Sequence, residues 1–171
     1  MVQEFEAVFQ KYHSDVYRFL LKMSDYDKEM AEELTSETFY QAYLAIARFK
    51  GKCQIKTWLI QIAKNQFYAA LRKQKFKPTS FEDVVSEPAE DPVEEKIEEA
   101  YQRELLCHAR SIIEAMAPKM KEVMLYRIYS DLPYTQIAIL LSISESSAKV
   151  LYHRGKELLR KKLKEDHGYE I

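Results

Sequence analysis

The chain has 171 residues, 47% of them apolar and 31% charged, a balance typical of folded water-soluble domains. Only 3 glycines and 5 prolines are present, which disfavours an all-β fold with its many tight turns. The net charge of −1 conceals two opposite blocks: residues 50–77 carry eight basic side chains and no acidic one, and residues 78–104 carry ten acidic and two basic ones. The composition predicts an all-α protein whose charge is segregated along the chain.

Apolar residues recur at helical spacing in three segments of the first 75 residues. The first contains Val8, Tyr12, Val16, Phe19 and Leu20, and the second contains Met30, Leu34, Tyr40, Ala45 and Ile46. Asp25 or Asp27 is a possible N-cap for the second segment. After a short basic loop around Gly51, Thr57 is expected to cap a third helix that runs to about Lys73. Its expected buried face comprises Ile55, Leu59, Ile62, Ala63, Ala70 and Leu71.

Residues 76–91 lose this periodicity and contain two prolines and many acidic side chains, which indicates a linker. Asp91 then offers an N-cap with Pro92 at the first helical position, and the helical period continues to about Ala117. Pro118 and Pro133 mark further helix starts. We therefore predict two small helical domains, 1–75 and 92–171, joined by an acidic flexible linker over 76–91.

The clearest motif lies near the end of the chain. Residues 134–141 read as a short helix, 142–144 as a tight turn, and Glu145 onward as a longer helix with Ser144 as its N-cap, which together fit a helix-turn-helix. The second helix of such a motif presents its first turns to the major groove, and basic residues further along contact phosphates. The expected outward residues are Glu145, Ser146, Lys149, Val150 and His153, with Arg154, Lys156, Arg160 and Lys161 able to reach phosphates.

The basic block forms the second candidate surface. On the predicted helix 57–73, a polar stripe at intervals of three or four residues lies opposite the apolar face, and it consists of Thr57, Gln61, Lys64, Tyr68, Arg72 and Lys75. Trp58 and Phe67 flank the stripe, and Lys50, Lys52 and Lys56 lie just before it. Lysines that neutralise phosphates, together with rings that stack on exposed bases, are the ingredients of single-strand binding. Each ring taken singly is better explained as a core residue.

No catalytic, cofactor or metal site is predicted. Cys53 and Cys107 have neither disulfide nor metal-ligand spacing, and no Ser, His and acid set converges in sequence. Cys53 lies among lysines, which would lower the pKa of its thiol and make a redox role conceivable, although a reduced bystander is the simpler interpretation.

Three segments resemble a known family. Residues 31–39 (AEELTSETF) and 56–65 (KTWLIQIAKN) resemble the sigma-two domain of bacterial sigma factors, and residues 134–162, including His153-Arg154-Gly155, resemble their sigma-four domain. Two such domains joined by a short linker are the layout of the small extracytoplasmic-function (ECF) group of the sigma-70 family. Ser36 replaces the glutamine usual in the family, and Leu151 replaces an arginine usual in its recognition helix.

The resemblance implies a role in transcription initiation, with three contact surfaces. Docking on the clamp of core RNA polymerase would use Glu33, Leu34, Ser36, Glu37, Tyr40 and Gln41. Reading and melting of the −10 promoter element would use Lys50, Lys52, Gln54, Lys56, Thr57, Trp58, Gln61, Lys64, Asn65, Tyr68 and Arg72. Reading of the −35 element as duplex would use Ser144, Glu145, Ser146, Ser147, Lys149, Val150, His153, Arg154 and Lys156.

The partners implied by the resemblance are core RNA polymerase (clamp and flap), promoter DNA and an anti-sigma factor. No small-molecule substrate and no membrane insertion are expected. The implied location is cytoplasmic and nucleoid-associated, and an anti-sigma factor can hold the protein at the membrane.

The alternatives from the residues alone are a stand-alone helix-turn-helix regulator, expected to be dimeric, and an all-helical adaptor. The regulator leaves the basic loop and the helix around Glu33 without a role, and the adaptor predicts no salt-dependent affinity for DNA.

Overall fold

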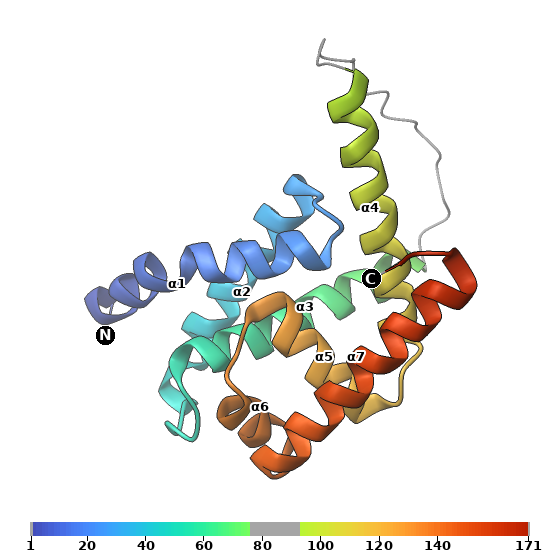
Figure 1. Cartoon of the computed structure of the whole chain (residues 1–171). Helices are drawn as coiled ribbons and strands as arrows, with labels where there is room; N and C mark the ends of the chain where they lie inside the picture. Colours follow the sequence, from blue (N-terminus) through green and yellow to red (C-terminus); the bar gives the residue numbers. More distant parts are fainter. Residues whose placement is uncertain (1, 76–92, 171) are drawn as a thin grey trace.

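A computed structural model of the chain describes residues 2–75 and 93–170, and the described residues form helices with no strand. Figure 1 shows two groups of helices packed side by side, which we call the first lobe (α1–α3) and the second lobe (α4–α7). The elements are α1 (Val2–Met23), α2 (Lys28–Ala45), a 3-10 turn (Ile46–Arg48), α3 (Ile55–Lys75), α4 (Val93–Glu114), α5 (Pro118–Ser130), α6 (Tyr134–Leu141) and α7 (Glu145–His167). The all-α prediction is confirmed for this part of the chain.

In the first lobe, α1, α2 and α3 pack against one another around a common core. Phe19, Leu20 and Leu59 are fully buried there, and Phe67 is buried as well, so this ring is a core residue. Asp27 caps α2, because its side chain accepts a hydrogen bond from the Met30 backbone N–H at 3.0 Å. Helix α3 begins at Ile55, two residues before the expected start.

Thr57 is therefore not the N-cap that the sequence predicted. It lies inside the first turn of α3, is fully buried, and donates a hydrogen bond to Gln136 of the second lobe at 3.0 Å. The other predicted cap, Asp91, lies with Pro92 and the predicted linker 76–91 outside the described residues.

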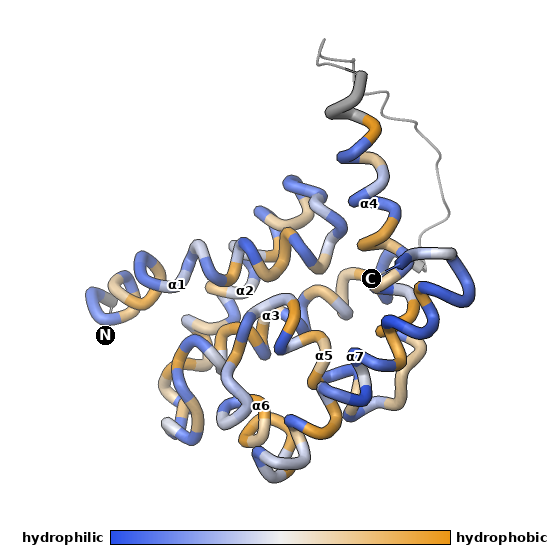
Figure 2. Tube along the Cα trace, viewed as in Figure 1, coloured by the Kyte–Doolittle hydropathy of each residue, from blue (hydrophilic) through white to orange (hydrophobic). Residues whose placement is uncertain are grey.

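In the second lobe, α7 packs against α4, α5 and α6. The helix-turn-helix prediction matches the observed α6, turn and α7, and the Ser144 side chain accepts a hydrogen bond from the Ser147 backbone N–H at 3.0 Å. Ser142 ends α6 with a left-handed backbone (φ 52°), a conformation that glycine adopts more readily. Figure 2 shows much of α7 as hydrophilic, while α5 and α6 carry more hydrophobic residues.

The free end of α4 projects from the rest of the molecule in Figure 1. Its exposed apolar side chains include Ile97, Tyr101 and Leu106. No helix in the described part of the chain is both long and apolar enough to cross a membrane.

Candidate nucleic-acid and polymerase interfaces

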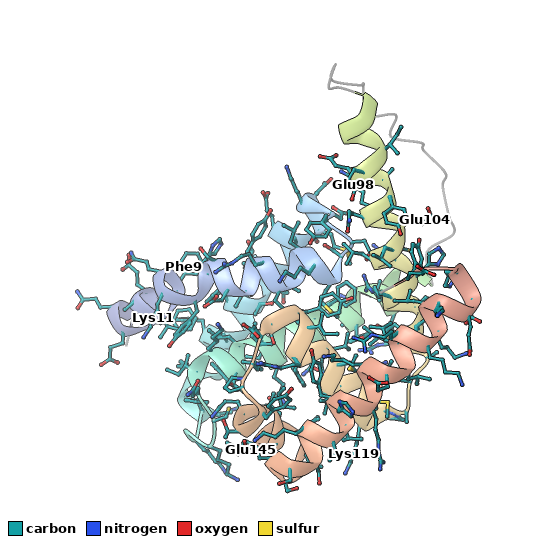
Figure 3. All side chains as sticks on the ribbon, viewed as in Figure 1. Phe9, Lys11, Glu98, Glu104, Lys119 and Glu145 are labelled. Carbon is teal, nitrogen blue, oxygen red and sulfur yellow. The ribbon has the colours of Figure 1, made fainter. Side chains whose placement is uncertain are left out.

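The start of α7 is open to solvent. Helix α6 and the buried residue Ala148 hold α7 against the lobe, and its opposite face carries the nine residues predicted to read duplex DNA. All nine are exposed, and they are Ser144, Glu145, Ser146, Ser147, Lys149, Val150, His153, Arg154 and Lys156. Figure 3 places Glu145 at the end of the molecule remote from Glu98 on the free part of α4. The start of α7 is therefore accessible, as the recognition helix of a helix-turn-helix needs to be.

Within this face, Lys149 Nζ lies 2.7 Å from Glu145 Oε1, one helical turn earlier. Both side chains are exposed, so the pair is weak and its lysine is free to exchange a carboxylate for a phosphate or a base edge. Gly155, on the opposite side of α7, permits close approach to α5: a Cβ atom at this position would lie 2.5 Å from Met124 Sδ.

The predicted polymerase-docking residues share one helix, α2. Glu33, Ser36 and Tyr40 are exposed, and Gln41 Nε2 donates to Glu37 Oε1 at 2.8 Å. Leu34 does not belong to this surface: it is a core residue, 6% exposed. The packing of α2 against α1 and α3 turns position 34 inward.

Leu44 was not among the residues predicted for this surface, and it is 56% exposed and lies one turn beyond Tyr40. The i, i+4 spacing of the two residues was the available signal. An exposed tyrosine and leucine beside carboxylates form an apolar spot with an acidic rim, as protein-docking faces often do.

The residues predicted to bind single-stranded DNA differ in their exposure to solvent. Lys50, Lys52, Gln54, Asn65 and Arg72 are exposed, and Lys56, Trp58, Gln61 and Tyr68 are partly covered. Lys56 forms an ion pair with Asp15 of α1 at 3.3 Å. Trp58 lies beside Phe49, with ring centroids 5.0 Å apart.

Thr57 and Lys64 are buried, so the expectation that the whole stripe lies open to DNA is wrong for this arrangement. The cause is the second lobe, which packs directly on α3. Lys64 pairs with Glu122 of α5, and Tyr68 Oη donates to Glu114 Oε1 at 2.7 Å.

The environment of Cys53 also differs from the expectation. Burial raises the pKa of the Cys53 thiol above its ordinary value, whereas the neighbouring lysines had suggested a lowered pKa. The thiol is thus less reactive than its sequence context indicated, which weakens the case for a redox role. Among the described residues, no group of three or more His, Cys, Asp or Glu side chains is placed to hold a metal ion.

Two family models match the chain. The family model described as Sigma-70 region 2 matches residues 8–77, and that described as Sigma-70, region 4 matches residues 109–159. The ECF RNA polymerase sigma factor SigM of Bacillus subtilis is 30% identical over 155 residues, which cover 91% of this chain and 92% of that protein. SigX of the same organism is 27% identical over 164 residues, covering 94% and 84%.

Two solved structures have a similar fold. One is CnrH in complex with the cytosolic domain of CnrY (TM-score 0.63, 14% identity, 97% of this chain and 91% of that one). The other is the sigma factor RpoE with the anti-sigma factor NepR from Bartonella quintana (TM-score 0.60, 19% identity, 96% and 99%).

The helix-turn-helix of the second lobe, together with the matches to Sigma-70 regions 2 and 4, places the chain in the class of DNA-binding transcription factors. Within that class, this chain belongs to the ECF group of the sigma-70 family. It is a sigma factor that directs promoter-specific transcription as a partner of core RNA polymerase and promoter DNA. The stand-alone regulator would leave the region 2 match without a role.

Proposed function

We propose that the three surfaces divide the work of promoter recognition in this chain. The exposed face of α2, extended to Leu44, binds the clamp of core RNA polymerase. The basic loop and α3 bind the melted −10 strand, and the first turns of α7 read the −35 element in the major groove. The observation that carries the proposal is the open, capped start of α7, whose nine predicted residues all face solvent.

The remaining expectations follow from the same division. The chain contributes recognition and melting, while the polymerase supplies the chemistry of RNA synthesis, so we propose that this protein has no catalytic activity of its own. Because core RNA polymerase and promoter DNA are cytoplasmic, we place its action there, at the nucleoid. The solved RpoE structure contains an anti-sigma factor, which supports an anti-sigma partner for this chain too.

The test is run-off transcription with purified bacterial core polymerase on fragmented genomic DNA, with and without this protein. We expect new start sites that depend on the protein and share two upstream sequence elements. Absence of transcripts together with absence of co-elution with core would contradict the proposal. Transcripts without a shared upstream element would contradict the role of α7 alone.

A further inference from the structure

The second lobe covers the part of α3 that we assign to the melted strand. Besides the ion pair between Arg110 and Asp25, three sets of polar contacts among the described residues cross the boundary between the lobes, and each of the three engages a residue of the proposed −10 surface. We call them together the latch: Lys64 with Glu122, Tyr68 with Glu114, and Gln136 with Gln54 and Thr57.

Lys64 is at the centre of the latch. Lys64 is only 8% exposed. Its ammonium group pairs with the Glu122 carboxylate, and Nζ lies 4.8 Å from the centroid of the Tyr126 ring. A desolvated lysine is held strongly by its partner, because an unpaired charge there is costly. In this arrangement Lys64 has no access to a DNA phosphate.

Tyr68 is engaged in the same way. Its hydroxyl donates to Glu114 Oε1 at 2.7 Å, while Lys121 Nζ holds Glu114 Oε2 at 3.0 Å and lies 5.1 Å from the Tyr68 ring centroid. The ring that would stack on a base is covered by a cation of the second lobe. Glu114 and Glu122 present to α3 the oxygen anions that a DNA backbone would present.

The third contact is made by the helix-turn-helix itself. Gln136 of α6 is buried, and its Oε1 accepts hydrogen bonds from the Gln54 backbone N–H at 2.9 Å and from Thr57 Oγ1 at 3.0 Å. This contact fixes α6 against the start of α3. It leaves the reading face of α7 exposed, so the latch masks only one of the two DNA surfaces.

We propose that the second lobe is a built-in competitor for the melted strand: its carboxylates occupy the site on α3, and the free protein binds single-stranded DNA only when the latch opens. This inference rests on the proposed function of α3. Apparent affinity equals the affinity of the open form multiplied by the fraction of open molecules, so any change that opens the latch tightens binding.

The deciding variant is the double substitution Glu114→Gln and Glu122→Gln, which removes both carboxylates without touching α3. Fluorescence anisotropy with a short labelled single strand should show binding about tenfold tighter than wild type. Because the loss of two negative charges alone favours DNA, the matched control is Glu98→Gln with Glu99→Gln. That pair removes the same charge from exposed positions of α4 in the same lobe and should change the affinity much less.

Opening of the latch can be measured in the absence of DNA by the fluorescence of Trp58, the single tryptophan of the chain. Trp58 lines a groove of about 320 Å³ together with Ile139 and Leu140 of the second lobe, so separation of the lobes exposes its ring. Acrylamide quenching should rise in the double variant and not in its control. Gln136→Ala, which breaks the third contact, should raise both quenching and single-strand affinity, and far-UV circular dichroism checks that each variant keeps its helices.

Unchanged single-strand affinity in both the double variant and Gln136→Ala would overturn the inference, whether or not quenching rises. Run-off transcription with core polymerase separates this failure from failure of the proposed function. Protein-dependent transcripts with no gain in single-strand affinity would support the sigma role and contradict only the proposal that the second lobe competes with DNA. A gain in affinity without transcripts supports the latch and contradicts the proposed function.

Discussion

Gly155 shows how one residue sets the spacing of the second lobe. Helices α5 and α7 pack against each other, and a Cβ atom at position 155 would lie 2.5 Å from Met124 Sδ and 2.8 Å from its Cγ. Met124 is fully buried, so its thioether has little room to move away. The motif His153-Arg154-Gly155 carries part of the family resemblance, and the packing of α7 against α5 gives the physical reason for its glycine.

Gly155→Ala should therefore lower the free energy of unfolding by about 1 kcal/mol. Overpacking costs roughly 1–3 kcal/mol, and the better helix propensity of alanine returns roughly 1 kcal/mol. Urea denaturation followed by circular dichroism measures the change. In a Met124→Ala background the same substitution should stabilise the protein, since the clash is gone. An equal loss in both backgrounds would contradict the packing explanation.

At the scale of elements, local signals predicted the structure well. Asp27 and Ser144 cap their helices as expected, α5 begins at the expected Pro118, and the helix-turn-helix matches its predicted bounds. These features depend on residues a few positions apart, so a single sequence contains the necessary information.

Contacts between segments far apart in the chain could not be predicted from sequence patterns. Lys64 and Glu122 are 58 residues apart, and Gln136 and Gln54 are 82 apart. Periodicity predicted a polar stripe on α3 but gave no information about what covers it, and two of its residues, Thr57 and Lys64, are buried. The same limit explains Leu34, whose inward direction depends on how α2 packs against its neighbours.

The start of α7 should determine preference for the −35 sequence. Ser146→Ala or Lys149→Ala should change the discrimination among bases at one or two positions by roughly 1–3 kcal/mol, because contacts to base edges carry sequence information. Arg160→Ala, further along the exposed side of α7, is the control and should weaken all duplexes about equally. The measurement is a competition assay with promoter duplexes that differ at single positions. Uniform weakening by Ser146→Ala and Lys149→Ala would reassign them to the DNA backbone.

For the whole molecule, the tyrosines around the boundary between the lobes link stability to pH. Burial raises the pKa of Tyr126 above its ordinary value of 10.0, and the nearby Glu122 carboxylate raises it further. Burial and the Glu114 hydrogen bond act on Tyr68 in the same direction. The folded protein thus holds these protons more tightly than the unfolded chain does.

Their contribution to stability is complete below pH 10 and is lost as the pH rises through the folded-state pKa. Tyr126→Phe should make the decline of the free energy of unfolding above pH 10 shallower, because one of the shifted groups is gone. Urea titrations across this range measure the slope. Tyr40→Phe, at a residue 57% exposed, is the control and should leave the slope unchanged. A slope unaffected by Tyr126→Phe would contradict the assignment.

The burial of the Lys64–Glu122 pair determines how ionic strength acts on this protein. The two side chains are only 10% and 24% exposed, so dissolved salt screens them weakly, whereas Lys50 and Lys52 lie open to solvent and are screened fully. Added salt therefore weakens the attraction of a nucleic acid for the basic loop without loosening the contact between the lobes. A rise in ionic strength therefore shifts the balance toward the closed arrangement, and a fall in ionic strength shifts it toward binding of the nucleic acid.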